Sequence, residues 1–146
     1  MKARDILEDK GTRVVTIHED NMLVDVMSHF LVNRVGSLVV VDKFDNILGI
    51  VAPLDVLEAV NRDPELITTM KVEEVMSTNV IVANPDEEVG RLMAIMTENR
   101  IRHIPIIDAG KLAGIVSIGD VVKAQLTVHE VHISYLKDYI EGKYPA

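Results

Sequence analysis

Four residues late in the chain carry side chains that could do chemistry. Ser117, Asp120 and His103 are the residue types of a nucleophilic triad, and Arg102 adds a planar cation beside the histidine. However, the sequence contains no nucleophile elbow and no Walker loop. The same residues suit binding, because a carboxylate accepts hydrogen bonds from sugar hydroxyls and a guanidinium pairs with phosphate oxygens. We therefore expect a binding site and no enzymatic activity.

Two histidines could suggest a metal site. His129 and His132 lie about one helical turn apart, a spacing that suits two ligands on one helix. No third ligand converges with them in the sequence, although a structural zinc site needs four. We interpret the pair as solvated or packed residues and expect no metal.

The segment that carries Arg102 and His103 occurs twice. Residues 33–42 (NRVGSLVVVD) return 66 residues later as residues 99–108 (NRIRHIPIID). Downstream, residues 49–56 (GIVAPLDV) match residues 114–121 (GIVSIGDV). Units repeated at such a period usually cannot bury their apolar faces alone and must stack. Two copies of one unit therefore fill nearly the whole chain.

Within each copy, strand-like and helix-like patterns follow each other in one order. The first copy places strand, helix, strand and strand at residues 14–17, 23–30, 38–41 and 47–51. The second copy places them at residues 80–82, 89–96, 104–107 and 112–116. A last helix begins near Asp55 and near Asp120, where a carboxylate suits a helix N-terminus. The predicted unit is β-α-β-β-α, and the fold class is α/β (α+β).

The repeat and the residues after it predict the organisation of the chain. We assign the first unit, a linker, the second unit and a C-terminal helical tail to residues 1–62, 63–70, 71–127 and 128–146. In the tail, helical spacing predicts an apolar stripe formed by Val128, Val131, Tyr135 and Tyr139. Such a helix could pack on its own module, bridge a homodimer or dock on a regulated protein.

Composition narrows the class of protein. The chain has 146 residues, 48% of them hydrophobic, enough for one sizeable core or two small ones. A net charge of −8 argues against nucleic acid as a partner, because phosphate backbones are bound by a surplus of Lys and Arg. Cysteine is absent, and no apolar run approaches the roughly 18 residues that a membrane span needs. We expect a cytoplasmic protein that binds neither nucleic acid nor membrane.

The order of elements, the duplicated Asn-Arg-x-x-x-h-x-h-h-Asp segment (h, apolar) and the Gly-h-h-Ser-x-x-Asp of residues 114–120 resemble a known family. It is the tandem cystathionine-β-synthase (CBS) domain pair, or Bateman module, here of the small stand-alone bacterial or archaeal type. The resemblance covers roughly residues 2–127. It implies two CBS units packed with pseudo-two-fold symmetry, adenosine ligands in clefts between them, and regulation of another protein. It also implies a homodimer, because such modules commonly dimerise.

The resemblance assigns a nucleotide site to the second unit. Asp120 matches the ribose-binding aspartate of the family, and Ser117 matches a hydroxyl that contacts the ribose or α-phosphate. Arg102 and His103 match positions that face the phosphates. The family receives the adenine near residues that correspond to Ser77, Thr78, Val80, Ile104 and Pro105. Ordinary structural roles stay open for all of these residues, such as a helix cap for Asp120.

The first unit departs from this pattern. Asp55 is retained, but Ala52 replaces the hydroxyl residue, and Gly36 and Ser37 replace the cationic pair. A weaker second site is assigned to Lys10, Val14, Gly36, Ser37 and Asp55, with Lys10 or Arg13 as substitute phosphate contacts. A structural, empty first site is the favoured interpretation.

We therefore expect a sensor module for AMP, ADP, ATP or NAD as a regulatory ligand, without a catalytic cofactor. Its regulated protein is not identified by the sequence. The alternative is a structural or protein-interaction module with no physiological nucleotide.

Overall fold

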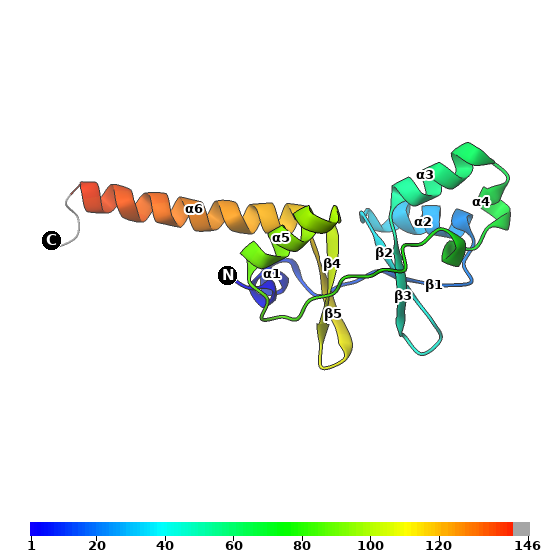
Figure 1. Cartoon of the computed structure of the whole chain (residues 1–146), viewed down its shortest axis with the longest axis horizontal. Helices are drawn as coiled ribbons and strands as arrows, with labels where there is room; N and C mark the ends of the chain where they lie inside the picture. Colours follow the sequence, from blue (N-terminus) through cyan, green and yellow to red (C-terminus); the bar gives the residue numbers. More distant parts are fainter. Residues whose placement is uncertain (142–146) are drawn as a thin grey trace. The chain divides into compact units, whose positions relative to one another are not determined.

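The computed structural model describes residues 1–141, without the side chains of Val131, Tyr135 and Tyr139 (Figure 1). These residues form two compact units that do not coincide with the two sequence copies. The central unit is Arg13–Ile81, and the C-terminal unit combines Met1–Thr12 with the chain from Val82 onward. Each unit has a hydrophobic core of its own.

The central unit is built on a three-stranded sheet. Its elements in chain order are β1 (Thr16–His18), α2 (Leu23–Asn33), β2 (Leu38–Val41), β3 (Ile47–Val51), α3 (Pro53–Arg62), α4 (Leu66–Thr69) and the 3-10 helix η1 (Val72–Glu74). Strand β2 lies between β1, which is parallel to it, and β3, which is antiparallel. All four residues of β2 are buried, as expected for the middle strand of a sheet covered by helices.

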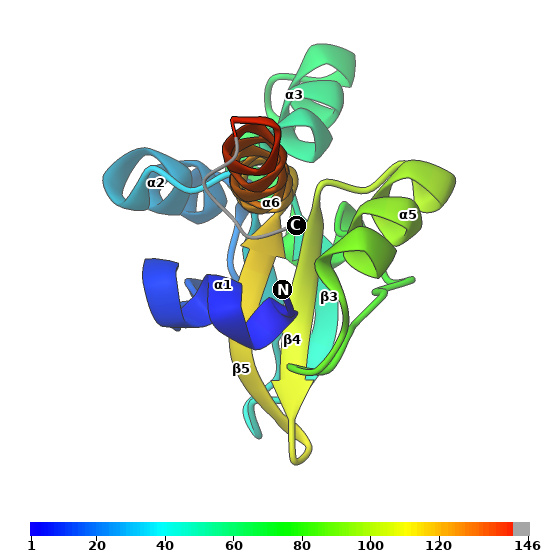
Figure 2. The ribbon, with the colours of Figure 1, turned by 90° about the vertical axis from the view of Figure 1, so that its left-hand side faces the viewer.

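The C-terminal unit contains a β-hairpin flanked by helices. Its elements are α1 (Ala3–Lys10), α5 (Val89–Asn99), β4 (His103–Asp108), β5 (Lys111–Ser117) and α6 (Ile118–Ile140). Strands β4 and β5 are antiparallel, and α1 contacts β5 while α5 contacts β4 (Figure 2). Helix α1 contributes Ala3, Ile6 and Leu7 to the core of this unit.

The backbone reproduces the repeat. Helices α2 and α5 end at equivalent arginines in the left-handed conformation, Arg34 with φ 51° and Arg100 with φ 55°. In both copies, the two strands after this point form an antiparallel pair that leads directly into a helix. The predicted strand-strand-helix part of the unit is therefore confirmed.

The strand predicted at residues 80–82 does not form. The neighbouring Ala83 makes only an isolated parallel bridge to Ile106, with hydrogen bonds to Pro105 and Ile107 of 3.1 and 2.8 Å. The chain passes from one unit to the other between Ile81 and Val82, so this apolar run joins two cores and does not lie within one sheet. The C-terminal unit accordingly has a two-stranded sheet.

Two other segments carry structure of their own. Residues 63–70, assigned to a linker, contain α4, which contacts α2 and α3. In the tail, α6 continues without a break to Ile140, as predicted. Of the stripe predicted there, Val128 is half-buried, whereas the side chains of Val131, Tyr135 and Tyr139 lie outside the described part of the chain. Within residues 1–141, no helix combines the length and apolar character that a membrane crossing requires.

Candidate functional site

Asp120 lies in the first turn of α6, directly after β5, and is held from both sides. Its Oδ2 accepts a hydrogen bond from the backbone N–H of Ser117 at 2.8 Å, and Ser117 Oγ accepts one from the N–H of Asp120 at 3.2 Å. This reciprocal pair caps the helix. The structural role of Asp120 as a cap is therefore present, and it orients the carboxylate.

Lys10, the last residue of α1, reaches the same carboxylate. Its Nζ donates to Asp120 Oδ2 at 2.7 Å and to the carbonyl oxygen of Ile115 at 3.0 Å. The ion pair is partly shielded from solvent, with 32% and 21% of the surfaces of the two side chains exposed. Lys10, which we grouped with Asp55 from the sequence, thus pairs with Asp120 inside the C-terminal unit, and its contact with a ligand at Asp55 stays a prediction.

The surroundings of Asp120 keep it ionised. Burial by itself would raise the pKa of this carboxyl. The hydrogen bond from Lys10, those from Ser117 and the charge of Lys10 outweigh burial, so the pKa of Asp120 lies below its ordinary value. The carboxylate is thus ready to accept further hydrogen bonds.

His103 begins β4, where it is paired in register with Ser117 on β5. Burial lowers the pKa of His103, the positive charges of Lys10 and Arg102 lower it further, and the charge of Asp120 opposes them. Arg102 is exposed, while its carbonyl oxygen accepts a hydrogen bond from the N–H of Ile118 at 2.8 Å. The charges of Lys10, Arg102 and Asp120 thus all act on His103, so two cationic side chains lie near one carboxylate, an arrangement that favours an anionic ligand.

The remaining residues assigned to the second-unit site are placed differently. Ile104 and Pro105 follow His103 on β4 and are buried, Ile104 as part of the core. Ser77, Thr78 and Val80 belong to the central unit. There Ser77 lies beside β3, exchanging backbone hydrogen bonds of 2.8 and 3.0 Å with Ile50. Contact between a ligand at Asp120 and any of the residues named in this paragraph as site residues stays a prediction.

The equivalent position in the central unit lacks these cations. Asp55 Oδ2 accepts a hydrogen bond from the N–H of Ala52 at 2.8 Å, which caps α3 as Asp120 caps α6. Among residues 1–141, Asp55 forms no ion pair. Gly36 is exposed, Ser37 is buried and Val14 is half-buried. These residues offer a phosphate group no positive charge.

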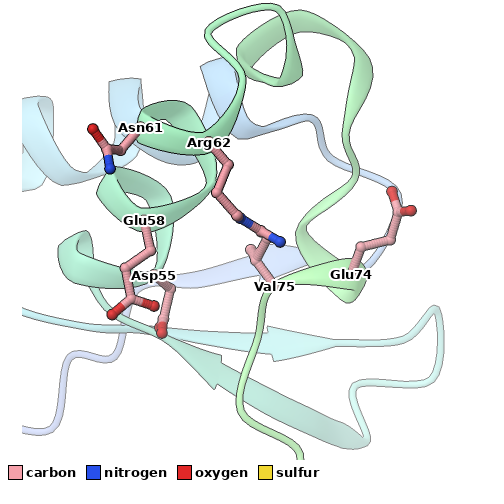
Figure 3. A pocket seen from close by; sticks show the side chains of 6 residues that line it. All are labelled: Asp55, Glu58, Asn61, Arg62, Glu74 and Val75. Carbon is pink, nitrogen blue, oxygen red and sulfur yellow. The ribbon is translucent and has the colours of Figure 1, made fainter.

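An open pocket of about 560 Å³ lies on the central unit, beside Asp55 (Figure 3). Four of its lining residues come from α3, and two follow along the chain at η1: Asp55, Glu58, Asn61, Arg62, Glu74 and Val75. Three carboxylates against one guanidinium make this pocket repel anions. Of these lining residues, only Asp55 is predicted from the sequence as a site residue, because α3 and η1 meet through tertiary packing.

The histidine pair on α6 stands apart from these groups. His129 and His132 are both exposed. Within the described part of the chain, no group of three or more His, Cys, Asp or Glu side chains is placed to hold a metal ion.

Comparison with known proteins identifies relatives over the whole repeat. The family model described as "CBS domain" matches residues 3–62 and 72–127. The mitochondrial CBS domain-containing protein CBSX3 of Arabidopsis thaliana is 32% identical over 148 residues, covering 96% of this chain and 72% of the relative.

Solved structures agree with this match. The CBS-domain protein ATU1752 from Agrobacterium tumefaciens has a TM-score of 0.81 and 35% identity, covering 85% of this chain and 92% of that one. The CBS domain pair of protein MJ0100 has a TM-score of 0.73 and 25% identity, covering 85% of this chain and 94% of that one. The MJ0100 structure is a complex with 5′-methylthioadenosine and S-adenosyl-L-methionine.

Proposed function

Because the chain belongs to the CBS domain family and carries two tandem CBS domains, we propose that it is a regulatory module that binds an adenosine-containing nucleotide at Asp120. The observation that carries the proposal is the ionised Asp120 carboxylate, which Lys10 and Ser117 hold beside His103. The adenosine ligands of the MJ0100 pair support the ligand class. We propose no catalytic step and no catalytic cofactor.

The charges around Asp120 favour a ligand that carries phosphate. AMP, ADP, ATP and NAD each combine ribose hydroxyls with phosphate groups. The hydroxyls can donate hydrogen bonds to the carboxylate, and the phosphate oxygens can pair with Lys10 and Arg102. S-adenosylmethionine and methylthioadenosine offer the ribose but no phosphate. We therefore expect the phosphorylated ligands to bind more tightly than these two.

Binding is coupled to α1 through Lys10. Among the described residues, the hydrogen bonds to the Asp120 carboxylate end at Oδ2, and Oδ1 is left for a ribose hydroxyl. A second hydroxyl would compete with the ammonium of Lys10, which would then turn to the phosphate. Since Lys10 ends α1, this exchange changes what holds the end of that helix and gives ligand occupancy a structural consequence.

Partners are the second part of the proposal. Helices α2 and α3 of the central unit expose large apolar side chains, among them Val24, Met27, Leu31, Leu54 and Leu57. Exposed apolar patches of this kind mark interaction sites. We propose that they contribute to a homodimer, and that an unidentified protein is regulated by it. The lack of cysteine suits the reducing cytoplasm in which we propose that it works.

Thermal unfolding with and without ligand tests the nucleotide site. A ligand at about 100 times its Kd stabilises the folded state by about 2.7 kcal/mol. We expect AMP, ADP, ATP or NAD to raise the Tm of the wild type, and Asp120→Ala to abolish the rise. Asp55→Ala is the matched control, because it removes the equivalent helix cap from the other copy.

Each comparison is made with the same variant without ligand, since losing a cap costs about 1 kcal/mol by itself. If neither protein responds to any adenosine ligand, the alternative function, a structural or protein-interaction module, replaces this one. If Asp55→Ala abolishes the rise in Tm and Asp120→Ala does not, the nucleotide site is at Asp55 and the proposed site at Asp120 is wrong.

A further inference from the structure

Helix α6 presents a mostly apolar stripe at heptad spacing, interrupted by one histidine. The sequence interval between successive residues of the stripe alternates between four and three: Val122, Leu126, His129, Ile133, Leu136 and Ile140. All six residues are exposed, with 65% of the surface of Ile133 and 82% of that of Ile140 open to solvent. This face differs from the stripe that sequence analysis predicted at residues 128–139, and the helical spacing of 3.5 residues is that of a coiled-coil seam.

Helix α6 uses a different face to join its own unit. Val121 and Ala124 are buried in the core, and the helix contacts α1 and α5. These buried positions lie in its first two turns. Beyond them, α6 runs past α1 and α5 of the same unit (Figure 1). The segment from Leu126 to Ile140 spans about 22 Å at 1.5 Å per residue, enough for four layers of a helix pair.

We propose that this stripe pairs antiparallel with α6 of a second copy of the chain. The charges beside the stripe select this occupant. Glu130 and Lys137 flank it on one side, seven residues apart, and both are exposed. In an antiparallel pair whose layers join Ile133 of one copy to Leu136 of the other, Glu130 of each copy faces Lys137 of the other.

The pair between Glu130 and Lys137 therefore forms twice, once in each direction between the two copies, as a two-fold axis requires. In a parallel pair, Glu130 would instead lie near Gln125 and Lys137 near His132, so no opposite charges would meet. The charge pattern thus specifies both a second copy and its direction. This interface is separate from the apolar surface of α2 and α3.

Cysteine cross-linking tests the pairing, because the chain contains no cysteine. Single variants Ile133→Cys and Leu136→Cys are purified, oxidised alone, and then oxidised as a mixture. We expect a disulfide-linked dimer mainly in the mixture, since each position faces the other and not itself. Ser134→Cys, one residue off the stripe, is the matched control.

Two outcomes would overturn the proposal. Efficient cross-linking of Ile133→Cys with itself would indicate a parallel pair. Cross-linking no faster than that of Ser134→Cys would mean that the stripe does not pair with a second copy, and would leave a different protein as its occupant.

A charge swap provides a second, independent test by sedimentation equilibrium. Glu130→Lys or Lys137→Glu alone should weaken self-association about three- to tenfold, as expected for two lost surface ion pairs. The double variant should recover wild-type association, and no recovery would contradict the antiparallel register. The Tm rise with nucleotide should stay unchanged in all three, so failure here is distinguishable from failure of the nucleotide site.

Discussion

At the scale of single residues, Asp120 combines a helix cap with an ion pair, and the two roles depend on different neighbours. Ser117 supplies the cap from the adjacent turn, whereas Lys10 supplies the ion pair from α1. Substitutions at Lys10 therefore test the ion pair and leave the cap intact.

Lys10→Met removes the ammonium and keeps most of the side chain's length. We expect the pKa of Asp120 to rise toward its ordinary value, because a hydrogen bond and a nearby positive charge are lost. Affinity for AMP should fall about tenfold or more, the equivalent of one charge-assisted hydrogen bond. NMR titration of the carboxyl and calorimetry measure the two effects.

Lys123→Met is the matched control, because Lys123 pairs with Asp9 at 3.6 Å on an open surface. It should change neither quantity. Equal losses of affinity in both variants would mean that only the net charge matters.

His103 should make stability depend on pH. Its folded-state pKa is lowered by burial and by the charges of Lys10 and Arg102, so the folded protein favours the neutral ring. This contribution is fully present above the unfolded pKa of about 6.5 and is lost as the pH falls through the folded pKa. Urea unfolding between pH 7.5 and 5 should show a smaller loss of stability for His103→Gln than for the wild type. Parallel curves for the two proteins would contradict the prediction.

At the scale of elements, the two copies contain equivalent glycines that are packed in different ways. A Cβ added to Gly49 on β3 would lie 2.7 Å from both the Met76 sulfur and the Ser77 carbonyl oxygen. A Cβ added to Gly114 on β5 would lie 2.6 Å from a methyl group of Leu7. Backbone yields less readily than the end of a side chain.

Gly49→Ala should therefore destabilise the protein more than Gly114→Ala, with costs of about 1–3 kcal/mol or more for overpacking. In a Leu7→Ala background, the cost of Gly114→Ala should nearly vanish, because the opposing methyl groups are gone. Urea unfolding of the single and double variants measures this. An undiminished cost in the Leu7→Ala background would show that something other than Leu7 opposes the new methyl group.

At the scale of the whole molecule, the N-terminal helix belongs to the unit formed by the end of the chain. Leu7→Ala should cost about 2–5 kcal/mol, as removal of a buried leucine side chain does. Hydrogen exchange should then accelerate in β4 and β5 and much less in β1–β3. Leu23→Ala, in the core of the central unit, should give the opposite pattern. Equal acceleration in both sheets would mean that the two units unfold as one.

The sequence by itself determined the order of elements and the local chemistry of the repeat. Apolar runs predicted β2, β3, β4 and β5, helical spacing predicted α2 and α5, and the carboxylates of Asp55 and Asp120 marked the starts of α3 and α6. The CBS resemblance also followed from these residues. Such signals are local, because periodicity and capping depend on neighbours within a few turns.

Only the tertiary structure decided which partners those elements found. Hydrophobic periodicity shows that a face is buried, but it does not say against which sheet. Lys10 therefore could not be assigned from sequence to Asp120, 110 residues away, nor could the apolar run at residues 80–82 be recognised as the connection between two cores. The exposed stripe on α6 could not be predicted from the sequence either. Its residues could have formed the buried face until the core showed that Val121 and Ala124 take that place.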